Sequence, residues 1–147
     1  MAHPPAKHEL EVDEAVARVA AGVTRLGTEP IARADARGRV LAAPVRSPVF
    51  LPPWDNSAMD GYAVRSADIT TVPVRLRVTE TVAAGQFPSH AVQAGEATRI
   101  MTGAPVPDGA DTVVRVEDTD AGLDQVEVRV NRDARKNVRP RGEDIAA

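Results

Sequence analysis

The first periodic pattern along the chain is a stripe of apolar residues near the N-terminus. Its members recur at steps of four and three positions: Val12, Val16, Val19, Val23 and Leu26. This spacing predicts a helix of about four to five turns over residues 9–26, because residues three and four apart share one helical face. Asp13 and Glu14 in its first turn and Arg25 in its last turn suit the helix dipole. Gly27 is a plausible stop, and the stripe needs a partner surface.

Beyond residue 70 the apolar period changes from helical spacing to alternation. One side carries Val72, Val74, Leu76, Val78 and Glu80, with Arg75, Arg77 and Thr79 between them. This alternation predicts a half-buried strand, and further short strands are predicted at 97–101, 112–117 and 125–130. Turns that contain Gly or Pro separate the strands, and no helical pattern lies between them. We therefore expect an antiparallel sheet or irregular barrel, and an α+β class that is mostly β.

These patterns divide the chain into three segments. Residues 1–8 are expected to be a flexible tail, and residues 9–46 to hold the helix and a connector that Pro44 interrupts. Residues 47–147 are expected to form a β-rich lobe.

Composition narrows the kinds of site and compartment. The 147 residues include no cysteine, which excludes disulfides, thiolate metal sites and cysteine nucleophiles and fits a reducing, cytoplasmic setting. No run of roughly twenty apolar residues is present, so we expect a soluble protein with no signal peptide and no membrane span.

The net charge of −3 argues against nucleic acid or an anionic membrane as a partner. One basic stretch, residues 129–141, nevertheless stands out, and Asp133 is its single acid. Its basic members are Arg129, Arg132, Arg135, Lys136, Arg139 and Arg141. Two interpretations stay open, a solvated face of a strand and loop or a site for anions.

The stretch "LPPWDNSAMDGYAVR", residues 51–65, concentrates turn residues and carboxylates, but it fits no generic motif. An EF-hand alignment fails at Ala58 and at Ala67, where calcium ligands are required. A nucleophilic serine is unsupported because Ser57 lacks the Gly-x-Ser-x-Gly elbow, and the chain has no phosphate loop. The residues alone therefore indicate a polar, proline-braced loop.

Taken with two further strings, this stretch resembles the signature of the MoeA family, which includes the E domain of gephyrin. The other strings follow in the expected order, "RIMTGAPVPDGADTVVRVED" at 99–118 and "NVRPRGEDI" at 137–145. The resemblance covers residues 10–145. It implies a molybdopterin molybdenumtransferase, which inserts molybdenum from molybdate into adenylylated molybdopterin with Mg²⁺.

The resemblance also implies an assembly. The family forms a homodimer whose active cleft lies between the β-rich lobe of one subunit and an α/β lobe of the other. This chain matches only the N-terminal region, so we expect the α/β lobe and a C-terminal barrel to follow residue 147 and to be required partners. We expect no catalysis by this chain alone. A non-catalytic dimerisation or scaffold module derived from the same family is the alternative.

Three residues match cleft positions of the family, and the resemblance implies that they carry catalysis: Asp60, Thr102 and Asp144. Asp60 and Asp144 are also the expected Mg²⁺ ligands, since a hard cation prefers oxygen. For Asp60, the alternative is an Asx-turn that needs no ligand.

Five more residues are expected to bind the anionic small-molecule substrates: Asp55, Asn56, Ser57, Arg139 and Arg141. Guanidinium forks suit phosphate. The first three have an alternative role in holding the shape of the loop, and the arginines have one as surface partners of Glu143. Trp54 and Tyr62 are expected to anchor the loop to the sheet rather than to stack on a pterin.

Overall fold

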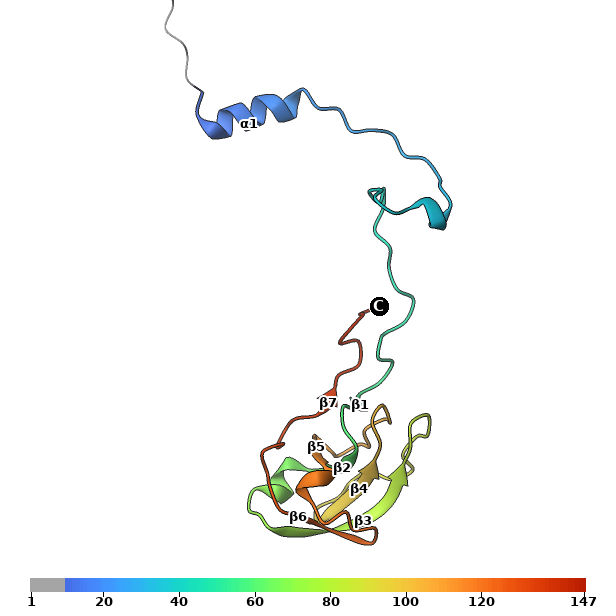
Figure 1. The fold of residues 1–147 in the computed structure, drawn as a ribbon, viewed down its shortest axis with the longest axis vertical. Helices are drawn as coiled ribbons and strands as arrows, with labels where there is room; N and C mark the ends of the chain where they lie inside the picture. The colour runs from blue at the N-terminus through green and yellow to red at the C-terminus, as the bar shows by residue number, and fades with distance from the viewer. Residues whose placement is uncertain (1–9) are drawn as a thin grey trace, which may run out of the picture. The chain divides into compact units, whose positions relative to one another are not determined.

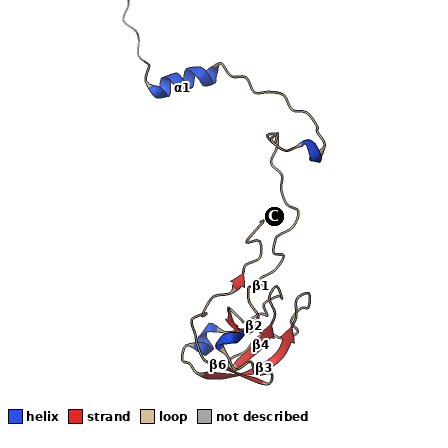
Figure 2. Cartoon of the chain, viewed as in Figure 1, coloured by secondary structure: helices blue, strands red, loops and turns tan. Residues whose placement is uncertain are grey.

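The computed structural model describes residues 10–147, and the tail expected at residues 1–8 lies outside them. The chain divides into two units, of which the first ends at Pro44 and the second runs from Val45 to Ala147. Figures 1 and 2 show a helix in the first unit and the strands in the second. Within the described residues, no helix combines the length and the apolar content needed to cross a membrane.

Helix α1 spans Val12–Ala21, so the predicted helix is present but shorter at both ends. It stops at Gly22, which caps its C-terminus, and not at Gly27. Glycine and the β-branched residues that follow it are poor helix formers, which explains the early end. Arg18, and not Arg25, therefore occupies the last turn, where it pairs with Glu14 at 2.7 Å.

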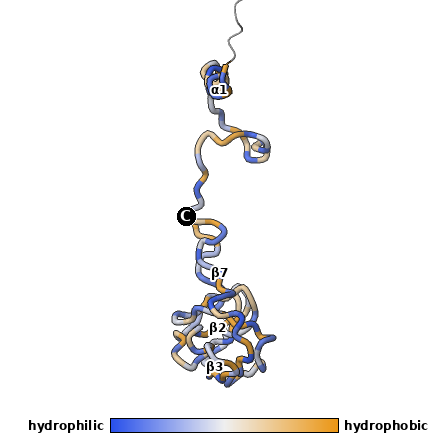
Figure 3. Tube along the Cα trace, turned by 90° about the vertical axis from the view of Figure 1, so that its left-hand side faces the viewer, coloured by the Kyte–Doolittle hydropathy of each residue, from blue (hydrophilic) through white to orange (hydrophobic). Residues whose placement is uncertain are grey.

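The apolar stripe of α1 is uncovered within the described chain. Val12, Val16 and Val19 are between 61% and 76% exposed, and no residue of the helix is buried. Figure 3 shows hydrophobic and hydrophilic residues mixed along α1. A short 3₁₀ helix, η1 (Arg33–Asp35), is the other regular element between residues 10 and 44.

Five strands of the second unit form one sheet in the order β5-β2-β4-β3-β6. Their bounds are β2 Gly61–Val64, β3 Val74–Val82, β4 Glu96–Ile100, β5 Thr112–Arg115 and β6 Gln125–Val128. The four predicted strands are all present, but the one expected at 112–117 gives way to a 3₁₀ helix, η3 (Val116–Asp118). The sequence pattern misses β2, because all four of its residues are buried and no polar position alternates with them.

The sheet is mixed, and not purely antiparallel as the sequence suggests. Strands β3 and β4 run parallel, whereas the other three strand pairs of the sheet are antiparallel. Parallel neighbours need a long crossover, usually a helix. Here the crossover, residues 83–95, is irregular, and Glu80 holds it by accepting hydrogen bonds from the backbone N–H groups of Ser89 and His90.

A bulge in β3 explains how its apolar residues reach both faces of the sheet. Leu76 packs in one hydrophobic cluster with Tyr62, and Val82 packs in a second cluster with Ile100. The register of β3 against β4 shifts between Val78 and Glu80. An extra residue in one strand reverses which side the following side chains face. The predicted single apolar side therefore ends at the bulge.

The sheet curls until its far edge meets the segment that follows β5. Thr119 forms an isolated bridge with Val128 of β6, and the Arg129 N–H donates to the Asp118 carbonyl at 2.9 Å. This curled sheet matches the expected mostly β lobe. A separate two-stranded ribbon pairs β1 (Asn56–Ser57) with β7 (Val138–Arg139).

Candidate functional site

Three segments that lie far apart in the sequence are hydrogen-bonded side by side. Ser57 is in the middle: its N–H donates to the Ala104 carbonyl at 3.0 Å, and its carbonyl accepts the Gly103 N–H at 2.8 Å. On the other side of the same residues, β1 pairs with β7. The three sequence motifs singled out above therefore meet in one place.

Asp60 and Thr102 are in direct contact. The Oδ1 atom of Asp60 accepts the Thr102 N–H at 2.7 Å and the Thr102 hydroxyl at 2.6 Å. These two donors, the hydroxyl first, lower the pKa of Asp60. The result is an exposed carboxylate that is ionised at neutral pH and fixed in orientation.

The loop that leads to Asp60 is held mainly through its backbone. The buried hydroxyl of Ser57 donates to the Met59 carbonyl at 2.5 Å and accepts the Met59 N–H at 3.2 Å, and the Asp60 carbonyl accepts the Val116 N–H at 3.0 Å. The next residue, Gly61, must be glycine, because a Cβ there would lie 1.9 Å from the Val114 carbonyl oxygen. These contacts support the shape-holding role of Ser57.

Asp55 and Asn56 differ in their surroundings. Asn56 is buried, and its Oδ1 has no hydrogen-bond partner among the described residues. Asp55 is exposed, and its Oδ1 accepts the backbone N–H of Arg141 at 2.7 Å. Asp55 thus ties the first motif to the third.

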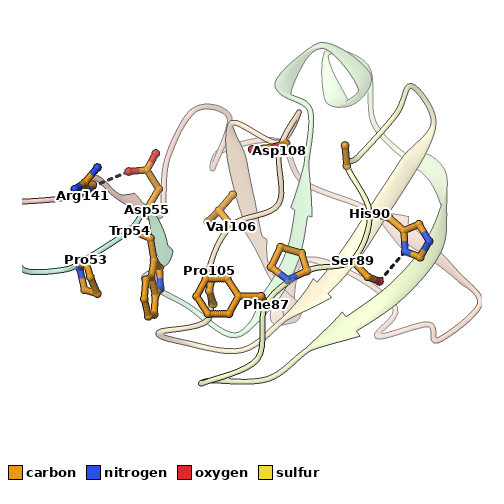
Figure 4. Close-up of a pocket in the computed structure, with 12 residues that line it drawn as sticks. Pro53, Trp54, Asp55, Phe87, Ser89, His90, Pro105, Val106, Asp108 and Arg141 are labelled. Atoms are coloured by element: carbon orange, nitrogen blue, oxygen red, sulfur yellow. Dashed lines mark hydrogen bonds between the residues drawn. The ribbon is translucent and has the colours of Figure 1, made fainter.

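A pocket of about 580 Å³ opens beside Asp55 and Arg141 (Figure 4). Its apolar walls include Trp54 and Phe87, whose ring centroids lie 4.8 Å apart in an edge-to-face arrangement. His90 lies at the opposite end from Arg141 in Figure 4. The pocket has the volume of a small-molecule site, and it combines aromatic walls with charged groups at its rim.

The two aromatic residues of the first motif have separate roles. Tyr62 is fully buried, and its hydroxyl donates to the Gly122 carbonyl at 2.9 Å, so it anchors the loop as expected. Trp54 is only half-buried and lines the pocket. Trp54 therefore contributes to a surface that a ligand can reach.

Asp144 lies beyond β7, next to Leu51. Its N–H donates to the Leu51 carbonyl at 2.9 Å, and no hydrogen bond within residues 10–147 links its carboxylate to Asp60 or Thr102. Arg139 is exposed in β7, opposite Asn56. The hydrogen bonds of Ser57 with Gly103 and Ala104 therefore bring Thr102 to Asp60, and no hydrogen bond within residues 10–147 brings Asp144 to either residue.

Comparison with known proteins identifies the family. Residues 10–147 match the family described as MoeA N-terminal region (domain I and II). The chain belongs to this family. The MoeA resemblance that the three motifs suggest is therefore confirmed over the whole described chain.

Relatives in the MoeA family are much longer than this chain. A molybdopterin molybdenumtransferase 2 from Mycobacterium tuberculosis is 48% identical over 117 residues, which are 77% of this chain and 29% of that protein. A molybdopterin molybdenumtransferase from Nostoc is 51% identical over 88 residues, 57% of this chain and 20% of that protein. The chain thus spans less than a third of either relative.

Solved MoeA structures share the fold. The crystal structure of the molybdopterin biosynthesis moeA protein from Pyrococcus horikoshii OT3 matches 76% of this chain with a TM-score of 0.68 at 34% identity, and the match covers 31% of that protein. Another crystal structure of a molybdopterin biosynthesis moeA protein from Pyrococcus horikoshii matches 92% of this chain with a TM-score of 0.65 at 32% identity, and the match covers 36% of that protein. The mostly β architecture is therefore that of the MoeA N-terminal region.

Two of the six basic residues in the basic stretch of this MoeA chain form ion pairs with acids within residues 10–147. Arg132 bonds Asp118 at 2.6 Å and 2.7 Å, and Arg129 lies 3.4 Å from Glu127. Asp133 is only 2% exposed, and its carboxylate accepts hydrogen bonds from Nε of Arg115 at 2.9 Å and from Nη2 of Arg115 at 3.1 Å. Burial by itself would raise the pKa of Asp133, but the hydrogen bonds from Arg115 outweigh it and lower that pKa.

Two residues near the site could not be identified from the sequence. Arg115 forms an ion pair with Asp133. Asn137 has a left-handed backbone with a φ of 64° and forms hydrogen bonds with two segments. The available signals were weak: Asp133 is the single acid of a basic stretch, and Asn137 opens the third motif.

Proposed function

We propose that this chain is the N-terminal part of an enzyme that inserts molybdenum from molybdate into adenylylated molybdopterin. In this proposal it contributes one wall of an active site that an α/β lobe of a second subunit completes. The observation that carries the proposal is the meeting of the three MoeA motifs around Ser57, with the Asp60 carboxylate fixed by Thr102. The relatives named molybdopterin molybdenumtransferase support the reaction type.

Asp60 is the residue that we assign to the reacting groups. Hydrogen bonds within residues 10–147 reach only its Oδ1, which leaves Oδ2 for a ligand. Mg²⁺ commonly takes one or two carboxylates and completes its shell with substrate phosphates and water. The described residues hold no group of three His, Cys, Asp or Glu side chains arranged for a metal. A Mg²⁺ ion at Asp60 would therefore need the substrate or the second lobe to complete its ligands. Asp144, the other proposed Mg²⁺ ligand, forms no hydrogen bond to Asp60 or Thr102 within residues 10–147 and is tested separately.

The pocket beside Asp55 is the proposed substrate-binding surface of this lobe. Arg141 offers a guanidinium group at its rim, and that group also lies 4.1 Å from the centre of the Phe50 ring. A cation over an aromatic ring is held in place while its N–H groups stay available to an anion. Arg139, exposed on β7, is a second proposed contact for the phosphorylated substrate.

The experiment uses a chimaera in which this chain replaces the matched segment of the Mycobacterium tuberculosis relative. Molybdenum insertion is assayed with adenylylated molybdopterin and molybdate. We expect Asp60→Ala to lower turnover by roughly 100-fold, since loss of one preorganised charged group costs about that much. Thr102→Ala, which releases the carboxylate, should cost roughly 10- to 100-fold.

Asp144→Ala tests the third assignment in the same chimaera, and Asp124→Ala is the matched control. Asp124 is exposed, and within the described residues only its carbonyl forms a hydrogen bond, to the Val78 N–H. If the Asp60→Ala, Thr102→Ala and Asp144→Ala variants are all as active as the unsubstituted chimaera, the site assignment is refuted.

A non-catalytic dimerisation or scaffold module is the second candidate. The uncovered apolar stripe of α1 supports it, because such a surface is commonly buried against another protein. If the chimaera is inactive while the purified 147-residue chain forms a defined dimer in analytical ultracentrifugation, this candidate replaces the first.

A further inference from the structure

Asn137 connects two segments that the sheet does not join. Its backbone carbonyl accepts the Ala58 N–H at 2.9 Å, and its side-chain Nδ2 donates to the Val113 carbonyl at 2.9 Å. Asn137 has a left-handed backbone, a conformation that Asn tolerates better than most residues. One residue thus contacts the loop that leads to Asp60 and the edge strand β5.

The side chain of Asn137 extends the hydrogen bonding of β5. The Val113 N–H already donates to the Lys136 carbonyl at 3.1 Å, on the edge of β5 that faces away from β2. On that same edge, the Nδ2 of Asn137 donates a hydrogen bond to the Val113 carbonyl. Val113 is fully buried, so its carbonyl would be costly to leave without a donor.

The segment before Asn137 is held by several hydrogen bonds, which fix the position of the Asn137 backbone. The carboxylate of Asp133 accepts hydrogen bonds from Nε and Nη2 of Arg115, and the Lys136 N–H donates to the Asp133 carbonyl at 2.9 Å. The Arg135 N–H donates to the Thr112 hydroxyl at 2.8 Å. Movement of Asn137 would therefore break contacts along most of the short loop.

Ala58 is two residues before Asp60, inside the turn that Ser57 braces. A displacement of Ala58 would shift this turn and, with it, the carboxylate that meets Thr102. We propose that Asn137 is a positioning residue: its carboxamide fixes the carbonyl that holds Ala58, and so it sets where Asp60 presents its carboxylate. The effect of Asn137 on catalysis rests on the proposed function, but its effect on the loop does not.

Two substitutions separate the carboxamide from the backbone conformation. Asn137→Asp keeps the size and the tolerance for a positive φ, but it removes the donor to Val113 and adds a negative charge near Asp133. Asn137→Gly keeps the backbone freedom and removes the side chain, and with it the donor, without adding a charge. Asn131→Asp is the matched control, because Asn131 lies in the same loop and its Nδ2 donates to the Thr70 carbonyl at 3.4 Å, away from Ala58.

The first measurement is amide hydrogen exchange by NMR on the ¹⁵N-labelled 147-residue chain. We expect both Asn137 variants to exchange roughly three- to tenfold faster at the Ala58 and Thr102 amides, as the loss of one hydrogen bond predicts. The amide of Val126 in β6 should keep its protection, and Asn131→Asp should leave all three amides unchanged.

Two results would overturn the positioning role. One is unchanged exchange at Ala58 and Thr102 in both Asn137 variants. The other is a loss of protection throughout the lobe, Val126 included, in both variants, which would make Asn137 a residue of general stability. A response confined to Ala58 and Thr102 supports the role even if the chimaera proves inactive, so the two proposals fail separately.

The second measurement is steady-state kinetics in the chimaera, if that protein is active. A misplaced Asp60 carboxylate should lower kcat roughly tenfold while KM changes less than about twofold, because the contacts of the pocket with substrate are kept. Equal kcat values for Asn137→Asp and for the unsubstituted chimaera would contradict a catalytic consequence.

Discussion

Helix α1 and strand β3 both carry regularly spaced apolar residues, but only β3 has apolar residues that are buried. Leu76 and Val82 are almost fully buried, whereas Val12, Val16 and Val19 are mostly exposed. The difference lies in the backbone. A strand must hydrogen-bond to neighbouring strands, which bring side chains to its faces, whereas a helix satisfies its own backbone.

The comparison shows that a pattern of apolar residues identifies a face that can be buried, but not the residues that bury it. In the lobe, the sheet curls, and the residues of its two hydrophobic clusters, all within residues 45–147, bury one another. A helix of 10 residues is marginal in water without packing. We therefore expect the lobe to unfold cooperatively and α1 to add almost nothing to its stability.

The largest expected effect comes from the second cluster. Ile100→Ala should lower the free energy of unfolding by about 2–5 kcal/mol, because it leaves a cavity at a fully buried position where β4 meets β2. Urea denaturation followed by circular dichroism measures it. The control is Leu123→Ala, since Leu123 is 66% exposed; a loss as large at Leu123 would contradict the assignment of the core.

Asp133→Asn should have the next largest effect. It keeps the shape of the side chain but removes the negative charge to which Nε and Nη2 of Arg115 donate. We therefore expect the free energy of unfolding, measured by urea denaturation, to fall by about 1–3 kcal/mol. Asp124→Asn makes the same chemical change at an exposed position and should leave the unfolding midpoint where it is.

Acid should destabilise the lobe by a similar or smaller amount through the same pair. Because the pKa of Asp133 is lower in the folded state than its ordinary value of 3.8, the stabilisation is complete above that value. It is lost as pH falls through the lower, folded-state pKa. Urea midpoints measured between pH 7 and pH 2.5 should fall at the acid end, and Asp133→Asn should make that fall shallower.

Local patterns predicted the elements whose residues alternate or recur, and missed those decided at a distance. The existence of α1 follows from its stripe, but its end depends on Gly22, which the pattern alone ranked below Gly27. Strands β3 to β6 follow from alternation and turns, whereas the two-residue strands β1 and β7 carry no such pattern. The parallel pairing of β3 with β4 could not be predicted, because its crossover is a loop held by Glu80 and carries no helical signature.

The site divides in the same way. Asp60 and Thr102 follow from motif resemblance, and their contact confirms that the motifs converge. Asn137 stays hidden in the sequence because its partners, Ala58 and Val113, are distant in the chain and are contacted through backbone groups, which leave no side-chain signature. Sequence therefore predicts better which group is presented than what holds it in place.

The smallest expected effect tests the uncovered stripe directly. Val16→Ala should change the free energy of unfolding of the chain by less than about 0.5 kcal/mol, because Val16 is exposed and alanine is the better helix former. Val114→Ala is the matched control: it makes the same change in the first cluster of the lobe, and it should shift the urea midpoint clearly. If Val16→Ala instead destabilises the chain as much as Val114→Ala does, the stripe is covered in solution. The comparison between helix and sheet would then fail, since both apolar faces would be packed.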